Sequence, residues 1–463
     1  MADVGRMHAG LDRKALALFP LVLTMFCLVS GGPYGLEPGI QQSGAGMGLL
    51  LLVIVPLIWA LPVALMTAEL TAAMPVEGGY YAWTKRAFGP FWGFQCAWWT
   101  WLYSIVDATL YPILFCDYLS TLVKLSTGND VLEKTPLLRW GIALVIVAVF
   151  AILNVRGTRL VGEVSVILGF LLTAPFLAMI GIGLWRMASH SGPIVRDFVP
   201  SGSSVGEVFA SGLYVIMWNY LGWDNLSTVA EEIDRPQRNF PRAIFICVPL
   251  VTAIYVLAVL VGLRFSPDLS QWNDKSWPVI ASSVGGPWLG TAMGYAALAS
   301  AVALFATALL AASRIPFVMA EDQFFPKKLL AVHPRYKTPW IAILVCAAIY
   351  GVLAGFFTFL TLLEVNVTLY SAAVTIELFA LIRFRRAEPD MPRPYRIPGG
   401  MAGVVVTAIL PMLVIGVAIF ASLREDWRDQ IPVLVLLATG PCYYLLAWRL
   451  RRNAQAKGSV AVS

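Results

Sequence analysis

Charged residues are scarce in this sequence of 463 residues. Asp, Glu, Lys and Arg make up 13% of it, whereas they make up about 25% of a soluble domain. Hydrophobic residues make up 59% and the mean hydropathy is +0.74, so we expect lipid to cover much of the surface. The net charge of +6 comes from short basic clusters between apolar runs. This pattern disfavours nucleic-acid binding, and the composition disfavours disorder and collagen-like repeats.

Histidine is also scarce, and cysteine occurs without pairing motifs. The three histidines lie in polar segments, at His8, His190 and His333, which excludes histidine-based metal or triad chemistry within a membrane. The six cysteines stand singly in apolar stretches, which indicates packed free thiols rather than disulfides or a zinc site. A Walker lysine motif, a His-Glu-x-x-His helix and a Gly-x-Ser-x-Gly elbow are missing as well. We therefore expect no cofactor, no bound metal and no enzyme activity.

Long apolar runs, by contrast, are abundant. A helix needs about 20 apolar residues to cross a hydrocarbon core about 30 Å thick. The first run is too long for a cleaved signal peptide and continues into Pro33 and Glu37 without a small-residue cleavage site, so we expect it to stay attached. The sequence predicts an all-α integral membrane protein with twelve transmembrane helices, near residues 15–41, 47–73, 91–122, 138–155, 160–185, 205–230, 241–263, 287–318, 338–356, 357–382, 401–423 and 431–449.

Lys and Arg predict the orientation of these spans. Most of the 33 basic residues lie in alternate connecting segments, for example Arg235, Arg238 and Arg242 after the sixth span. The positive-inside rule then places both tails, residues 1–14 and 450–463, in the cytoplasm. We expect a multi-pass protein of the plasma membrane.

Two of the predicted helices contain residues that interrupt a helix. The first carries Ser-Gly-Gly-Pro-Tyr-Gly at residues 30–35, where each glycine costs about 1 kcal/mol and proline removes a backbone donor. A plain proline kink is the alternative interpretation. The sixth carries Trp-Asn-Tyr-Leu-Gly-Trp-Asp-Asn at residues 218–225. Since the two breaks open corresponding halves of the chain, they point to an inverted-repeat transporter with a site at the membrane midplane.

Acidic residues lie within the predicted spans, whereas basic residues stand only at their ends. A carboxylate at the membrane centre costs about 2.5–3.5 kcal/mol, so it must be protonated, solvated or matched by a bound cation. Asp107 lies in the middle of the third span, Glu37 follows the first break and Asp224 lies in the second. We interpret these three as acceptors for an ammonium group or a coupling proton. Structural roles near span ends are expected for Glu69, Asp117, Glu163, Glu207 and Glu377, and Glu364 is assigned to neither group.

Dispersed motifs resemble one transporter family across nearly the whole chain. Residues 30–35 resemble the Gly-Ser-Gly-Ile-x-Gly of its broken first helix, and residues 74–83, Met-Pro-Val-Glu-Gly-Gly-Tyr-Tyr-Ala-Trp, resemble its signature between the second and third spans. Further matches are Gly222 to Asn225 with Glu231, Glu232, Pro236 and Pro241 to Ala243, then Ser313 and Arg314, and Pro392 to Pro398. In this order, the motifs resemble the amino acid-polyamine-organocation superfamily.

The stretches 29–37 and 107–112 look most like the polyamine uptake transporters of that superfamily. The resemblance implies proton-coupled uptake and a five-plus-five inverted repeat in residues 15–382, with halves at 15–185 and 205–382. A cytoplasmic loop at 383–400 and two additional helices at 401–449 would follow. The resemblance, together with the aromatic rings at the second break that can cover an ammonium group, implies substrate binding by Ser30, Gly31, Gly32, Tyr34, Glu37, Asp107, Tyr111, Trp218, Asn219, Tyr220 and Asp224. Glu37, Asp107 and Asp224 are also the candidates for proton coupling.

Two departures from the family bear on the substrate and on coupling. Pro33 removes a backbone N–H that could grip a carboxylate, which favours amine recognition. No Lys or Arg lies between Arg159 and Arg186, where some members carry a built-in lysine, so a carboxyl group would carry the coupling proton.

These patterns predict a secondary active transporter that moves a polyamine or amino acid by alternating access. The expected partners are that small-molecule substrate, a coupling cation (the proton) and the lipid bilayer, with no nucleic acid. The alternatives are a permease or exchanger for neutral or cationic amino acids, and a nontransporting sensor or channel on the same fold.

Overall fold

The computed structural model describes residues 15–128, 131–189, 198–199, 202–273, 275–356, 359–425 and 431–460. Within these ranges the chain is all-helical, apart from one isolated backbone bridge between Leu16 and Ile233. The helices are α1 (Leu18–Val29), α2 (Glu37–Ser43), α3 (Ala45–Val55), η1 (Pro56–Ala60), α4 (Leu61–Ala73), α5 (Tyr80–Phe88), α6 (Pro90–Thr127), α7 (Val131–Lys134), α8 (Pro136–Arg156), α9 (Thr158–Ser189), α10 (Val205–Trp218), η2 (Asn225–Glu232), α11 (Pro236–Phe265), η3 (Leu269–Gln271), α12 (Trp277–Gly285), α13 (Pro287–Ala312), α14 (Arg314–Glu321), η4 (Lys327–Leu330), α15 (Trp340–Leu353), α16 (Phe359–Ala387), α17 (Gly400–Glu425) and α18 (Ile431–Val460).

Nine helical segments of the described chain are long and apolar enough to cross a membrane. Three shorter apolar helices, α1, α10 and α15, coincide with the first, sixth and ninth predicted spans. The all-α multi-pass class is confirmed, whereas the count of twelve spans and the repeat remain predictions. The nine segments are Ala45–Ala73, Pro90–Lys124, Pro136–Arg156, Thr158–Ser189, Pro236–Phe265, Pro287–Glu321, Val365–Ala387, Gly400–Phe420 and Ile431–Arg449.

Proline marks the start of several of these helices. Pro90, Pro136, Pro236 and Pro287 stand in the first turn of α6, α8, α11 and α13. A helix leaves its first N–H groups without internal partners, so proline loses nothing there and its fixed φ favours the helical turn. The prolines in the sequence therefore mark where these helices begin.

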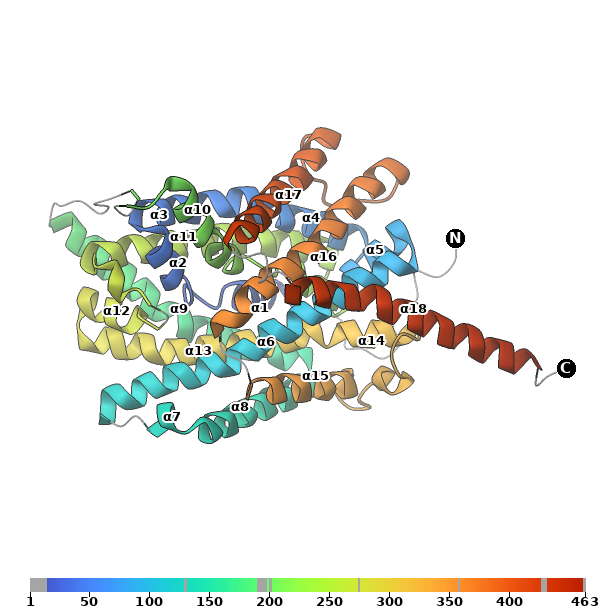
Figure 1. Cartoon of the computed structure of the whole chain (residues 1–463), viewed down its shortest axis with the longest axis horizontal. Coiled ribbons are helices and arrows are strands. Elements are labelled where there is room, and N and C mark those ends of the chain that lie inside the picture. Colours follow the sequence, from blue (N-terminus) through green and yellow to red (C-terminus); the bar gives the residue numbers. More distant parts are fainter. Residues whose placement is uncertain are drawn as a thin grey trace.

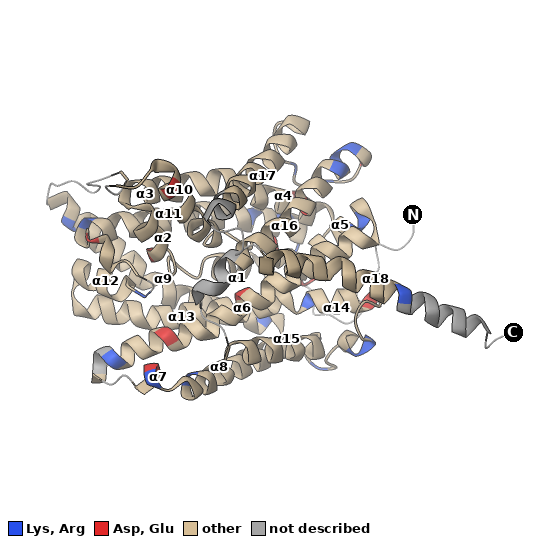
Figure 2. Ribbon diagram, viewed as in Figure 1, with Lys and Arg blue, Asp and Glu red and all other residues tan. Residues whose placement is uncertain are grey.

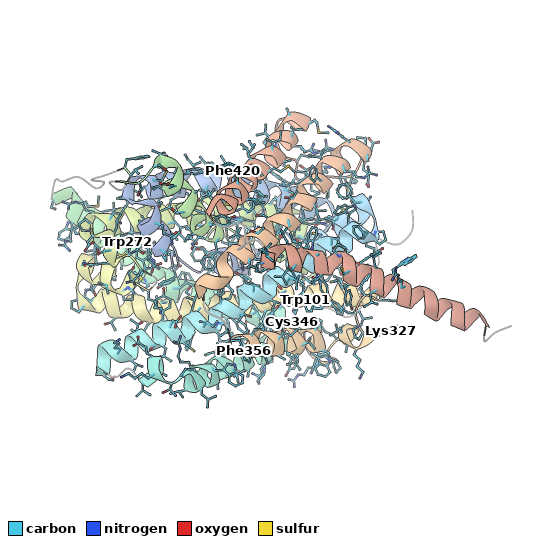
Figure 3. All side chains as sticks on the ribbon, in the orientation of Figure 1. Trp101, Trp272, Lys327, Cys346, Phe356 and Phe420 are labelled. Carbon is cyan, nitrogen blue, oxygen red and sulfur yellow. The ribbon has the colours of Figure 1, made fainter. Side chains whose placement is uncertain are left out.

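The connecting segments gather at the two ends of the bundle. In Figure 1, α7 and α12 lie at one end, and α5 and α14 at the other. Figure 2 shows many of the Lys, Arg, Asp and Glu residues toward those ends and fewer of them between. Trp272 and Lys327 mark the two ends in Figure 3. The bundle thus has an apolar middle flanked by two charged faces, as a bilayer requires.

Helix α13 forms the centre of the bundle. In its span, 89% of the most apolar stretch is buried, and it contacts α1, α6, α8 and α9. Small residues allow α13 to pack closely against its neighbours. At Gly294, for example, a Cβ atom would lie 2.5 Å from Leu122 Cδ2 of α6. Such contacts are how membrane helices associate when lipid removes the hydrophobic driving force. Helices α17 and α18 are peripheral, with 33% and 11% of the corresponding stretches buried.

Candidate substrate site

The first break lies between α1 and α2. Helix α1 ends at Val29, and Gly31, Gly32 and Gly35 take φ angles of 55°, 93° and 86° before α2 begins. These left-handed angles favour glycine. The carbonyls freed by the break are paired, because Ser300 Oγ donates to Gly31 O and Trp277 Nε1 donates to Pro33 O at 2.8 Å. Unwound backbone within a membrane protein is tolerated when its polar groups are hydrogen-bonded in this way.

We expect Gly31→Ala to destabilise the protein by about 1–3 kcal/mol. An alanine Cβ would lie 2.5 Å from Leu304 Cδ1 and would also require a positive φ. Thermal unfolding in detergent measures the effect. Gly416→Ala is the control, since Gly416 lies in helix α17 with no atom within 4 Å of its Cβ position. A Gly31→Ala protein as stable as the control would contradict the geometry.

The second break follows α10. That helix ends at Trp218, and the chain resumes as the 3₁₀ helix η2 at Asn225, with Gly222 at a φ of 87°. Asn219 Nδ2 donates to Gly35 O at 3.4 Å. Tyr255 of α11 bonds both breaks, because its hydroxyl lies 3.4 Å from Ser30 O and 3.1 Å from Asn219 O. The two interruptions therefore lie side by side.

The breaks and α6 enclose a cavity of about 30 Å³, which holds no more than about two water molecules. Six predicted site residues line it, namely Ser30, Tyr34, Asp107, Tyr111, Trp218 and Asn219. Tyr103, Tyr118 and Ser300, which sequence reasoning missed, line it as well. The cavity is too small for an organic solute and has to widen to admit one.

The other predicted site residues stand outside this lining. Gly31 and Gly32 form the break behind it, and Glu37 is buried with Oε2 accepting the Gly35 N–H at 2.7 Å. Tyr220 packs into the core, where its hydroxyl donates to Leu52 O at 3.2 Å. Asp224, like Glu37, has no exposed surface.

Asp107 is held by neutral donors, among them Tyr111, Asn366 and Trp218. The Tyr111 hydroxyl donates to Oδ2, and Asn366 Nδ2 of α16 donates to Oδ1 at 3.2 Å. Its exposed fraction is 6%, and it pairs with no Lys or Arg within the described ranges. A buried carboxylate that faces a cavity without a basic partner can receive a cation or a proton.

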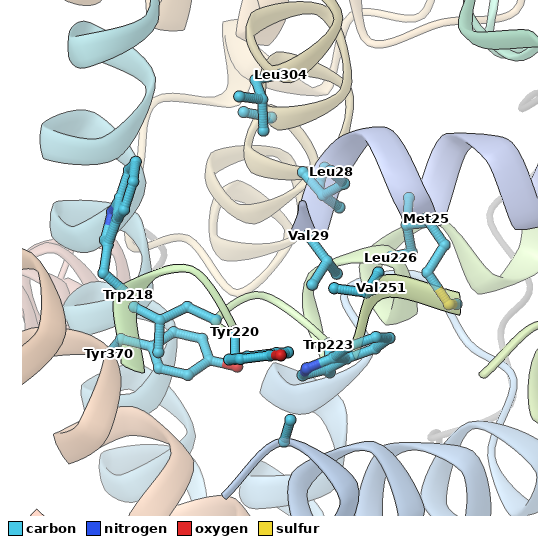
Figure 4. Close-up of a cluster of buried hydrophobic side chains, with 14 of the residues drawn as sticks. Met25, Leu28, Val29, Trp218, Tyr220, Trp223, Leu226, Val251, Leu304 and Tyr370 are labelled. Atoms are coloured by element: carbon cyan, nitrogen blue, oxygen red, sulfur yellow. The ribbon is translucent and has the colours of Figure 1, made fainter. Parts of the chain in front are cut away.

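Asp224 also accepts a hydrogen bond from α16, from a residue one helical turn beyond Asn366. The Tyr370 hydroxyl donates to Asp224 Oδ1, whereas Oδ2 has no hydrogen-bond partner. Figure 4 shows Tyr370 reaching toward the unwound stretch that carries Trp218 and Tyr220. Asn366 and Tyr370 are four residues apart, so one face of α16 serves both acids. Sequence reasoning missed this face. The one feature that could have indicated it is Asn366, a polar residue one turn from Tyr370 within an apolar span.

The remaining acids mostly have structural partners. Arg385 donates to both carboxylate oxygens of Glu69 at 2.6 Å, Asp117 pairs with Arg139, Glu163 pairs with Arg159, and Glu207 forms a capping box with Ser204 at the start of α10. The side chain of Glu364 lies outside the described residues.

Glu377 corrects the sequence interpretation. We expected it near a span end, within reach of headgroup water, but it has no exposed surface. Cys96 Sγ lies 3.7 Å from Oε1, and Oε2 has no hydrogen-bond partner. The physical reason is that α16 continues to Ala387 and packs against α5 and α6, which cover Glu377.

A buried ionic cluster closes the end of the bundle that carries α5 and α14. Arg314 Nη2 donates to Glu232 Oε1 at 2.7 Å and to Thr158 Oγ1 at 2.9 Å, and Arg314 Nε lies 3.5 Å from Glu77 Oε1. None of the charged side chains is exposed. Burial raises the pKa of Glu77 and the Glu232 carboxylate raises it further, whereas Arg314 lowers it. The cluster joins four segments that are far apart in the sequence.

Aromatic rings close the opposite end. Tyr34 packs on Phe176 with ring centroids 5.1 Å apart, and Phe176 packs on Trp277 at 5.3 Å. Trp277 belongs to α12, so this connecting helix covers the first break. Tyr34 also lines the cavity, so these rings cover it on the side of α12.

Within the described residues, no group of three His, Cys, Asp or Glu side chains is arranged to hold a metal ion. The site consists of carboxylates, phenols, an indole and amides. It is suited to binding a small cationic solute.

Comparison with known proteins agrees with these features. Residues 21–438 match the amino acid permease family. The polyamine transporter RMV1 of Arabidopsis thaliana is 32% identical over 432 residues, covering 93% of this chain and 85% of its own. The polyamine transporter PUT1 of Oryza sativa subsp. japonica is 34% identical over 411 residues, covering 88% and 74%. The branched-chain amino acid permease BcaP of Bacillus subtilis is 26% identical over 453 residues, covering 94% and 93%.

Proposed function

This chain belongs to the amino acid permease family and is a transporter rather than an enzyme, and from that premise we propose that it takes up polyamines by proton-coupled alternating access. The twelve spans, the five-plus-five repeat in residues 15–382, the plasma-membrane location and the cytoplasmic termini belong to the same proposal.

The observation that carries the substrate proposal is Asp107. Its carboxylate lines the cavity and accepts hydrogen bonds from Tyr111 and Asn366, and no Lys or Arg of the described part of the chain pairs with it. An ammonium group supplies the missing charge, and the rings of Trp218 and Tyr103 in the same lining add cation–π attraction. In the relatives named above, the polyamine transporters are more similar to this chain than the amino acid permease is.

The first break also favours an amine over an amino acid. An amino acid needs free N–H groups at the break for its carboxylate. Here the Gly31 N–H donates to Phe26 O, the Gly32 N–H to Ser30 Oγ and the Gly35 N–H to Glu37. Pro33 has no N–H to offer. Glu37 thus accepts an N–H group of the break that a substrate carboxylate would need.

Alternating access is supported by the two closures. The ionic cluster around Arg314 shuts one end and the rings of Tyr34, Phe176 and Trp277 shut the other. We propose that each opens in turn and that the cavity widens toward the open side. Asp107 would hold either the ammonium group or the coupling proton, and Asp224, with its unpaired Oδ2, is the second candidate for the proton.

We expect proteoliposomes that contain the full chain to take up labelled putrescine saturably under an imposed inward proton gradient. Unlabelled spermidine should compete at least about tenfold better than a neutral amino acid, because it gains the ion pair with Asp107. Protein-free liposomes and dissipation of the gradient are the controls. The reverse competition ranking would favour an amino acid permease, and uptake that is indifferent to the gradient would refute proton coupling.

A further inference from the structure

A second cavity, of about 900 Å³, lies on the periphery of the bundle. It follows α16 from Thr368 to Ala387 and is bounded by α6, α17 and α18. That stretch of helix rises about 28 Å, close to the thickness of the hydrocarbon core. Helix α17 packs on α16, while α18 packs on α6 and α16, and Figure 1 shows α18 running away from α16 toward the C-terminus. Because α17 and α18 are peripheral, with 33% and 11% of their apolar stretches buried, the cavity lies on the outer side of the bundle, where we expect lipid.

The lining changes in character along this length. Apolar side chains such as Ile376, Phe379, Ile415 and Leu437 form most of the wall. Phe379 is 48% exposed and Trp92, at one end, is 44% exposed. Tryptophan at such a position is typical of the boundary between hydrocarbon and headgroups. The wall thus suits an acyl chain over most of its length and a polar group at one end.

That end carries two exposed arginines, Arg383 and Arg386. They are three residues apart and therefore share a helix face, while Arg385 points away to its ion pair with Glu69. Arg383 Nε donates to Ala87 O at 2.6 Å, which leaves its terminal nitrogens available. Arg386 has no hydrogen bond or ion pair to any residue within the described ranges. Two guanidinium groups at the mouth of an apolar cavity match a phosphate that is joined to acyl chains.

We propose that this cavity binds an anionic phospholipid. The phosphate lies between Arg383 and Arg386, and an acyl chain lies along α16 between α17 and α18. The lipid fills the gap beside the helix that supplies Asn366 and Tyr370 to the two buried aspartates. This site is separate from the substrate cavity and does not depend on the proposed substrate.

Native mass spectrometry of the full chain in detergent tests the proposal by titration with phosphatidylglycerol and phosphatidylcholine of the same acyl chains. Both lipids carry a phosphate, but the choline cation of phosphatidylcholine cancels its charge, whereas phosphatidylglycerol keeps a net negative charge. Each arginine near an anionic lipid surface is worth about 1 kcal/mol, so we expect phosphatidylglycerol to bind about 30-fold more tightly. Arg383→Gln with Arg386→Gln should remove this preference. The matched control is Arg156→Gln with Arg242→Gln, two exposed arginines outside the cavity lining, which should keep it.

A second variant keeps both arginines and blocks the cavity. Ala372 lines the wall, and Ala372→Phe should weaken the binding of both lipids at least about tenfold, because the ring takes the space of the acyl chain. Millimolar inorganic phosphate should not displace phosphatidylglycerol. Equal affinity of the wild type for the two lipids, an unchanged preference in the arginine variant, or displacement by phosphate alone would each overturn the proposal.

Discussion

Asp107→Asn is expected to lower putrescine uptake at low substrate concentration by at least about 30-fold. The substitution keeps the shape of the side chain and one acceptor oxygen for Tyr111 or Asn366, but it removes the charge that would bind the ammonium group. Truncating one partner of a buried charge pair costs about 2–5 kcal/mol, and each 1.4 kcal/mol corresponds to a factor of ten. Initial rates in proteoliposomes with equal amounts of inserted protein measure the effect.

Glu163→Gln is the matched control for Asp107→Asn. Glu163 also lies in a membrane helix, but it is exposed and pairs with Arg159 one turn away at 2.9 Å. Exposed pairs of this kind are worth about 0–1 kcal/mol, so uptake should stay within about twofold of the wild type. If the two variants lost uptake equally, Asp107 would have no place in the site.

The second large effect is expected at Arg314. Replacing it with Gln leaves Glu77 and Glu232 buried without a cation, and breaking a buried ion pair in this way costs about 3–5 kcal/mol. The free energy of unfolding, measured by denaturant titration in detergent, should fall by that amount. Arg159→Gln, which breaks only an exposed pair, should change it by less than about 1 kcal/mol.

A double variant separates the charge effect from a packing effect. Adding Glu232→Gln to Arg314→Gln removes one of the two stranded carboxylates, so part of the lost stability should return. A double variant that is less stable than Arg314→Gln alone would mean that packing, and not charge compensation, explains the cluster. Burial raises the pKa of Glu77 above that of an exposed carboxyl group, although Arg314 partly offsets this. Ionised Glu77 is therefore less favourable in the folded protein than in the unfolded chain, so the stability contributed by Glu77 should fall as the pH rises through that raised pKa.

Local signals account for what could be predicted from the sequence. Glycine and proline act on their own backbone, so residues 30–35 were predictable as the place where α1 stops. Asp107 was identifiable because it lies far from both ends of an apolar run. The shared face of α16 was not predictable, because a neutral amide and a phenol give no sign of burial in the sequence. Asn366 meets its acceptor only when α16 packs on α6, and Tyr370 only when α16 packs beside α10 and the second break.

The positions of Glu377 and Glu37 could not be predicted from the sequence. The position of Glu377 was judged from a predicted span end at residue 382, but α16 continues to Ala387, so a residue expected near headgroup water is buried. The sequence indicated that Glu37 follows the break. It did not indicate that Glu37 would bind the Gly35 N–H and thus stand outside the cavity lining. The burial of Glu377 depends on the packing of α16 against other helices, and the orientation of Glu37 depends on the backbone conformation of the break. The sequence specifies neither.

Tyr255 has a consequence for the timing of movement in the protein. A phenol has one hydroxyl proton, yet the Tyr255 oxygen faces two carbonyls, Ser30 O at 3.4 Å and Asn219 O at 3.1 Å. If either break moves away, the proton is free to bond fully to the carbonyl that stays. In the proposed alternating access, separation of one break would then be compensated by a stronger bond to the other, which favours movement of the two breaks in succession. The Tyr255 hydroxyl would thus couple the first break to the second.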